Sequence, residues 1–279
     1  IKAFYATPDR SYQIARGEIA LTDPGIPLIA VPTTAGSGSE ATHFAVVYLG
    51  LEKFSLASPY LLPDSVILDG QLIATGSAYQ KACSGLDTLA QAIESAWAVG
   101  STSASRVQSF QALRLCTNSL KQVVEGQADD LALQSMMNAA NLAGRAINVA
   151  KTTAAHAWSY GITSHHGVPH GHAVWLTLPT IFQMHAQAHE TRIIDTLGLK
   201  HLQGVIDQLM QIMSIPSADQ SASILRDYMA GIGLETQMSA VGADNVEKRR
   251  FLSKHVNIER MSNNPIVLGE NEISQIFDL

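Results

Sequence analysis

Carboxylates and imidazoles on an apolar, alanine-rich background are the residues of this chain that could do chemistry. Asp87, Gln91 and Glu94 stand at i, i+4 and i+7 in a segment with helical spacing, so they share one face of the predicted helix. A carboxylate on an otherwise apolar helix is costly unless another group compensates its charge. We therefore expect a compensating group, such as a metal cation, to face this helix.

Two histidines 14 residues apart could complete such a site. His156 and His170 are predicted to flank a loop that contains Gly161 and Pro169. Two imidazoles from separate elements plus the Asp87 carboxylate would make an open site for a divalent metal, with a position left for water or substrate. The alternative is chance clustering, because ten histidines in 279 residues must fall near one another somewhere.

The remaining candidates have plainer interpretations. Glu94 is interpreted as a structural carboxylate or as a group that orients a ligand. Four other histidines are interpreted as solvated residues of loops or helix surfaces: His165, His166, His185 and His189.

Five motifs occur one after another along the chain, and two of them contain the residues named above. They are PTTAGSGSE (32–40), KFSL (53–56) followed by PD (63–64), GLDTLAQAIE (85–94), HA (156–157) with PHG (169–171), and NNP (263–265). Together they resemble the motifs of the iron-containing (group III) alcohol dehydrogenase family. Five ordered motifs over nearly the whole chain are far more specific than any one of them.

The resemblance implies a metal-dependent oxidoreductase that moves a hydride between a nicotinamide cofactor and a small aldehyde or alcohol. The metal, Fe²⁺ or Zn²⁺, would be held by four residues: Asp87, Gln91, His156 and His170. NAD(H) or NADP(H) would contact the loop and strand residues Thr33, Thr34, Gly36, Ser37, Gly38 and Lys53. Hydroxyls and backbone N–H groups in such loops suit phosphate and ribose oxygens.

The chain departs from the family pattern at two positions. Gln91 stands where the family usually has a second ligand histidine, and an amide oxygen is a harder and weaker ligand than an imidazole. Tyr160 stands where a histidine usually relays the proton, so the proton would reach the alkoxide through Tyr160 or water. The family's N-terminal dinucleotide-binding part, with its Gly-Gly-Gly-Ser loop, is expected to be largely absent.

Positive charge precedes the first ligand histidine. Arg145 and Lys151, with the hydroxyls of Thr152 and Thr153, suit an anionic group on the substrate, and we also count Lys151 as a catalytic candidate. This pattern resembles the phosphonoacetaldehyde-reductase-like branch, which would convert phosphonoacetaldehyde to 2-hydroxyethylphosphonate. The alternative is that both charges are solvated at a helix end.

The elements that must position these residues change character along the chain. Short apolar runs at 27–32, 44–48 and 65–69 predict strands. Helical spacing dominates afterwards, at 85–98, 103–124, 131–149 and 221–231, with a further helix in 171–186. We predict an α/β N-terminal remnant (1–70) plus an all-α C-terminal domain (71–279), the architecture of dehydroquinate synthase and group III alcohol dehydrogenases.

Composition narrows the functional class. A net charge of -6 argues against nucleic acid as a partner, and no apolar run of about 18 residues predicts a membrane span. The N-terminus lacks the pattern of a signal peptide, and Cys83 and Cys116 are expected to be reduced and buried. We therefore expect a cytoplasmic protein without a membrane or nucleic-acid partner, and a homodimer.

Two rival functions remain open. A sugar-phosphate cyclase of the dehydroquinate-synthase type is a lyase on a related fold, but it would need a Glu as first metal ligand where this chain has Asp87. A truncated chain that folds but catalyses nothing is the second rival, and fold-level analogy cannot separate it from an enzyme.

Overall fold

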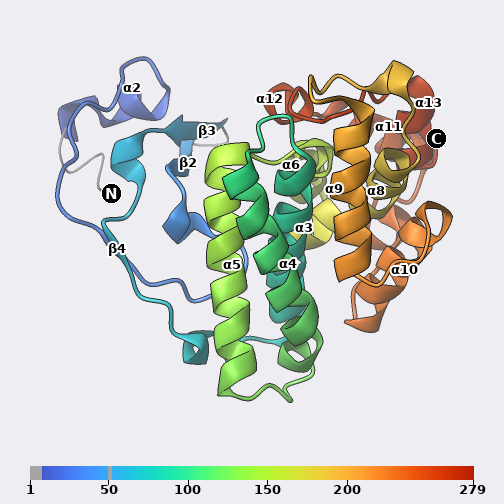
Figure 1. Ribbon diagram of the computed structural model, residues 1–279. Coiled ribbons are helices and arrows are strands. Elements are labelled where there is room, and N and C mark those ends of the chain that lie inside the picture. Colours follow the sequence, from blue (N-terminus) through green and yellow to red (C-terminus); the bar gives the residue numbers. More distant parts are fainter. Residues whose placement is uncertain (1–7, 50–51) are drawn as a thin grey trace.

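The computed structural model describes residues 8–49 and 52–279. Three long, neighbouring helices form its centre: α3 (Ala78–Trp97), α4 (Ser103–Val124) and α5 (Asp130–Ala150) (Figure 1). Side-chain caps define where each helix begins. Ser77 accepts from the backbone N–H of Gln80, Thr102 and Ser105 form a reciprocal capping box, and Asp129 accepts from Ala132. Short connections make successive helices antiparallel neighbours.

The remaining helices follow in sequence order and cover one side of this layer (Figure 1). They are α6 (Ala154–His166), α7 (His170–Trp175), α8 (Leu178–Ala186), α9 (Gly198–Ile212), α10 (Ala218–Gly231), α11 (Val246–Lys254), α12 (Ile258–Met261) and α13 (Glu270–Phe277). We call residues 78–279 the helical bundle.

The loop predicted between His156 and His170 was wrong for most of its length. Helix α6 runs through Gly161 and ends at His166, with Gly167 as a left-handed C-cap at φ 66°. The helix continues through Gly161, where a glycine leaves room for a neighbouring side chain: a Cβ there would lie 3.0 Å from the Cβ of His255. Gly85 was likewise wrongly taken as a helix start, since it lies inside α3 where Leu120 of α4 leaves no room for a side chain.

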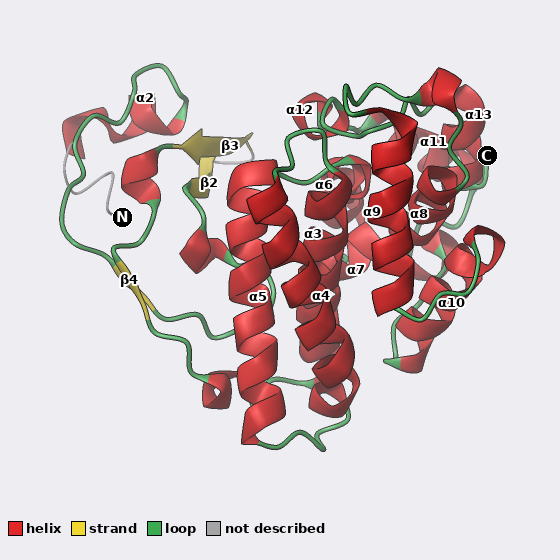
Figure 2. Ribbon diagram, viewed as in Figure 1, coloured by secondary structure: helices red, strands yellow, loops and turns green. Residues whose placement is uncertain are grey.

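The strands lie on one side of the molecule, with β2 and β3 next to α5 and β4 farther out (Figure 2). Strand β1 (Ile29–Ala30) pairs in parallel with β4 (Ser65–Val66), and β2 (Phe44–Leu49) pairs antiparallel with β3 (Glu52–Ala57). A short helix, α2 (Ser11–Ala15), packs against β3. We call residues 8–66 the strand portion, and its buried apolar cluster is small, consisting of Ile14, Ala15 and Leu56.

The predicted fold class, an α/β remnant followed by an all-α domain, is confirmed. Its division at residue 70 stays a prediction. Three tryptophan N–H groups align the helices: Trp97 donates to Thr153 Oγ1, Trp158 to the carbonyl of Ser253, and Trp175 to the carbonyl of Leu86. None of the described helices combines the length and apolarity needed to cross a bilayer.

Candidate metal centre

Three ligand-type side chains from three helices converge inside the bundle. Asp87 lies in the middle of α3, His156 in the first turn of α6, and His170 at the start of α7. One ligand atom from each lies within 4.8 Å of the other two. Gly171 makes this approach possible, because a Cβ there would overlap the Cys83 carbonyl oxygen of α3.

Three buried polar atoms at this point lack a hydrogen-bond partner among the described residues. They are Oδ1 of Asp87, Oε1 of Gln91 and Nε2 of His156. A buried polar atom without a partner costs about 1–3 kcal/mol, so three at one place call for a bound group. Two oxygens and one nitrogen, with a second imidazole beside them, are a donor set that suits a divalent transition metal. The residues therefore fit the metal that the sequence predicted.

The tautomer of His170 also suits a metal ligand. Its Nδ1 lies 3.3 Å from Oγ of Ser159, and that hydroxyl already donates to the carbonyl of His156 at 2.8 Å. The Ser159 oxygen therefore accepts from Nδ1–H, which leaves a lone pair on Nε2 of His170.

Gln91 is oriented by a contact outside the bundle. Its amide nitrogen donates to the carbonyl of Ser37 at 3.3 Å. The amide oxygen therefore points away from the Ser37 carbonyl, and it has no hydrogen-bond partner among the described residues. Its role as a metal ligand stays a prediction.

Glu94 is fully buried and holds His156 in place. Its Oε1 accepts from Thr153 N (3.2 Å), Thr153 Oγ1 (2.6 Å) and Ala155 N (3.0 Å), while Oε2 contacts Nδ1 of His156. Because Nδ1–H faces this carboxylate, Nε2 of His156 is left to point at Asp87, 3.4 Å from Oδ1. Glu94 is therefore an orienting group, which agrees with one of its two interpretations from the sequence.

The electrostatics of the metal-free site follow from these carboxylates. Burial alone would lower the pKa of His156, but Glu94 and Asp87 outweigh it and raise the pKa to about 9. Burial would raise the pKa of Glu94, yet the charge of His156 and its hydrogen bond hold it below the usual value. A proton on His156 thus stands in for the cation between the two carboxylates.

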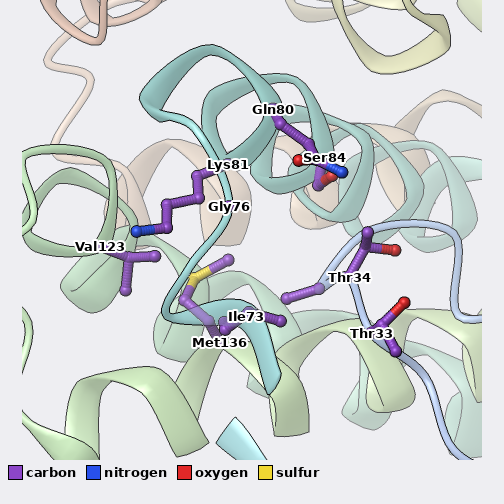
Figure 3. Close-up of a pocket in the computed structure, with 10 residues that line it drawn as sticks. Thr33, Thr34, Ile73, Gly76, Gln80, Lys81, Ser84, Val123 and Met136 are labelled. Carbon is purple, nitrogen blue, oxygen red and sulfur yellow. The ribbon is translucent and has the colours of Figure 1, made fainter. Parts of the chain in front are cut away.

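The predicted cofactor residues border the metal ligands in part. Thr34, Gly36 and Ser37 line a hollow of about 290 Å³ together with Asp87 and His170. Thr33 and Thr34 also line a much smaller apolar pocket of about 30 Å³ that includes Ile73 and Met136 (Figure 3). Lys53 belongs to β3, but its side chain lies outside the described residues.

Gly38 fixes the same loop to the bundle by a backbone contact. It adopts φ 59°, and a Cβ there would lie 2.6 Å from the Cα of Gly144 in α5. Thr88 Oγ1 adds hydrogen bonds to the carbonyls of Ala35 and Gly36, at 3.1 and 3.2 Å. The loop is thus held against both α3 and α5.

The other predicted residues lie in three different places. The ring of Tyr160 stacks on His170, with ring centroids 5.6 Å apart and an interplanar angle of 26°. Lys151 caps α5 and forms an ion pair with Glu259 at 2.6 Å. Arg145 is exposed and lines a separate hollow beside Glu40 and Asn148. The structure brings Tyr160 to the metal ligands and gives the two basic residues other surroundings.

Some residues of interest were missed or misjudged from the sequence. His185 was predicted to be solvated, but it is buried and stacks on Trp97 with centroids 4.4 Å apart. Tyr79 shares the hollow of Asp87 and His170 and donates to Nδ1 of His172 at 3.2 Å, because Nε2–H of His172 is bound to the Glu235 carbonyl at 2.7 Å. Its spacing from Asp87, two helical turns, could have revealed it.

Comparison with known proteins agrees with this geometry. Residues 81–279 match the model of the Fe-containing alcohol dehydrogenase family, C-terminal, and residues 1–70 match that of iron-containing alcohol dehydrogenase. The chain therefore belongs to the iron-containing alcohol dehydrogenase family.

Three individual relatives are between 22% and 30% identical to this chain. Phosphonoacetaldehyde reductase of Streptomyces viridochromogenes is 30% identical over 258 residues, which is 92% of this chain and 64% of that protein. The structure of sulfoacetaldehyde reductase from Bifidobacterium kashiwanohense in complex with NAD⁺ matches with a TM-score of 0.81 at 27% identity, covering 96% of this chain and 68% of that one. An iron-containing alcohol dehydrogenase from Thermococcus thioreducens shares the fold, with a TM-score of 0.83 at 22% identity over 99% of this chain and 71% of that one.

Proposed function

We propose that this chain is the metal-binding, catalytic portion of an NAD(P)-dependent aldehyde reductase or alcohol dehydrogenase. The convergence of Asp87, His156 and His170 carries this proposal, because ligand atoms from all three lie within 4.8 Å of one another and two of these side chains, Asp87 and His156, have a buried atom without a hydrogen-bond partner. The NAD⁺ bound to the sulfoacetaldehyde reductase structure supports the cofactor. The predicted cofactor loop and two of the metal ligands, Asp87 and His170, line one hollow, so a nicotinamide and a small carbonyl compound could meet there.

When bound, the metal polarises the carbonyl oxygen of the substrate and the nicotinamide supplies or accepts the hydride. Asp87, His156 and His170 would hold the metal, and Gln91 would supply a weak fourth donor. Glu94 keeps the proton of His156 on Nδ1 and so keeps Nε2 available. Tyr160 would hold or deliver the alcohol proton at its hydroxyl: burial raises its pKa, although Arg260 opposes the shift, so the phenol stays protonated at neutral pH.

The proposed substrate is a small aldehyde that carries an acidic group, with phosphonoacetaldehyde as the leading candidate. Its support comes from two relatives, named for a phosphonate-bearing and a sulfonate-bearing aldehyde. The roles of Arg145 and Lys151 toward this group stay predictions. The sugar-phosphate cyclase is disfavoured, since the matched family models are those of alcohol dehydrogenases.

Calorimetric titration of the metal-free protein with Zn²⁺, and anaerobically with Fe²⁺, tests the metal centre. We expect one equivalent to bind. Asp87→Ala and His170→Ala should weaken binding by more than the ten- to hundredfold that loss of a supporting group causes. His189→Ala is the matched control, because His189 is exposed. Wild-type affinity in Asp87→Ala would disprove the centre.

An aldehyde screen with NADH and NADPH tests the reaction itself. Phosphonoacetaldehyde should be reduced by the metal-loaded protein, and an uncharged aldehyde of similar size more slowly. An active metal-loaded protein excludes the non-catalytic alternative. Metal binding without activity on any aldehyde would support that alternative instead.

A further inference from the structure

A second hollow, of about 490 Å³, opens beside the metal centre and has basic walls. It is bounded by the β2–β3 hairpin, by α6 and by the segment 254–260. Its lining side chains that can donate to an anion are Lys254, Arg260, His165, His255, Ser55, Tyr160, Ser164 and Asn257. We call it the basic hollow.

The charge of the basic hollow is opposite to that of the molecule. The chain has 24 acidic and 18 basic residues, yet among the described residues that line this hollow Glu259 is the one carboxylate. Lys151 pairs with Glu259 at 2.6 Å, and their hydrogen bond lowers the pKa of that carboxyl. Within the described residues neither Arg260 nor Lys254 lies within 4.0 Å of a carboxylate oxygen, although the charge of Arg260 also helps to lower the pKa of Glu259.

The ring of Tyr160 connects the basic hollow with the metal centre, because it contacts both. Tyr160 lines the hollow and also stacks on the ligand histidine His170. Arg260 contacts the Tyr160 hydroxyl, and its guanidinium lies 5.6 Å from the centroid of the Phe44 ring. A molecule of a few atoms in the hollow would therefore meet Arg260 beside the residue that adjoins the metal ligands.

The segment that carries these charges is fixed to α6. The N–H of Asn257 donates to the Ala157 carbonyl at 3.0 Å, and Trp158 donates to Ser253. The Asn257 side chain accepts from the N–H of Arg260 at 2.9 Å. A preorganised guanidinium loses little entropy when it binds a planar or tetrahedral oxyanion.

We infer that the basic hollow is a binding subsite for an oxyanion, with Arg260 as its principal contact and Lys254 as a second. The inference rests on the proposed function and deepens it, because the oxyanion would be the acidic group of the aldehyde substrate. A phosphate of the dinucleotide has the same chemistry. It is the weaker assignment, since the predicted cofactor loop lines a different hollow. The sequence had pointed to Arg145 and Lys151, but Lys151 is neutralised by Glu259 and Arg145 faces elsewhere.

Calorimetric titration of the metal-free protein with phosphonoacetate tests the subsite without the metal or turnover. Arg260→Gln should raise the Kd on the order of tenfold to a hundredfold, the range for a charge-assisted contact. Lys254→Gln should raise it less, because Lys254 is exposed. Arg114→Gln, an exposed arginine on α4, is the matched control and should change nothing. Added NaCl should weaken wild-type binding more than binding to Arg260→Gln.

Two further arms separate the competing explanations. ADP-ribose replaces phosphonoacetate in one arm; if Arg260→Gln weakens only ADP-ribose, the hollow serves the cofactor and the inference fails. Arg145→Gln forms the other arm, and a loss of phosphonoacetate affinity there with none in Arg260→Gln would overturn it. Zn²⁺ titration of Arg260→Gln should match wild type, so a failed metal centre and a failed subsite give different results. If Arg260→Gln does not fold, Arg260→Met and Lys254→Gln give the same comparison, and wild-type affinity in both would refute the subsite.

Discussion

The helical bundle and the strand portion differ in the size of the buried apolar core that stabilises each of them. The bundle shares one continuous core that includes Leu86, Trp97 and Phe182, all almost fully buried. The strand portion has a three-residue cluster and two sheets of two strands each, an arrangement that is marginal on its own. The candidate metal ligands stand on the first region and the predicted cofactor loop on the second. Metal binding should therefore survive conditions that disorder the cofactor contacts.

Two matched leucine-to-alanine substitutions, one in each region, test this difference in stability most directly. Leu86→Ala removes a side chain with no exposed surface in α3 and should lower the free energy of unfolding by about 2–5 kcal/mol. Leu56→Ala, in the small cluster of β3, should lower it by less. Urea unfolding measures both losses when circular dichroism follows the whole chain and tryptophan fluorescence follows the bundle, where all three tryptophans lie. Equal losses in the two variants would contradict the comparison.

Acid should weaken the bundle through His185. Burial lowers its pKa from 6.5 to about 4, so the unfolded chain takes up this proton at a higher pH than the folded one. The stability contributed by neutral His185 is thus present above pH 6.5 and is lost as the pH falls toward 4, a change of about 3 kcal/mol.

Urea midpoints between pH 8 and pH 4 measure this loss. His185→Gln removes the titrating group, and its stability should depend less on pH over that range. Parallel curves for the two proteins would show that burial of His185 does not set the acid sensitivity of the bundle.

Removal of the carboxylate that holds His156 should separate metal affinity from the fold. Glu94→Gln leaves the side-chain shape but removes the charge, and we expect Zn²⁺ affinity to fall tenfold to a hundredfold. Because Glu94 also accepts from Thr153 and Ala155, thermal unfolding must be measured beside the titration. Unchanged Zn²⁺ affinity in a folded variant would show that Glu94 has only a structural role.

The smallest expected effect lies where the two regions meet. Gln91 donates to Ser37 of the strand portion, while its buried oxygen has no hydrogen-bond partner among the described residues. Gln91→His supplies a stronger donor, so Zn²⁺ affinity should rise, by about tenfold. The loop at Ser37 would lose this hydrogen bond and should exchange its amide hydrogens faster. A chelator competition that gives the wild-type affinity would mean that residue 91 does not touch the metal.

The long helices were predicted well from the sequence, whereas the boundary between helix and loop after His156 was predicted poorly. Helix α4 was predicted over its full range because its apolar period is unbroken. Helix α6 was missed because Gly161 signals a loop locally, whereas its reason for being there is contact with His255, far along the chain. Asp87, His156 and His170 were predicted through motifs, and the structure brings these three side chains together. Arg260 was not, because nothing near it in the sequence reveals that it meets Tyr160.

The contact between Gly38 and Gly144 has a consequence for motion. Backbone meets backbone there without side chains between them, so neither surface can move closer to the other. Asn141 donates to Glu40 and His43 donates to Asn148, and these two hydrogen bonds lie on either side of Gly144 along α5 and oppose rotation about the contact. The predicted cofactor loop is therefore held at a fixed distance from α5 and at a fixed angle to it. A methyl group at either glycine would push the loop away from the helix and leave the metal ligands where they are.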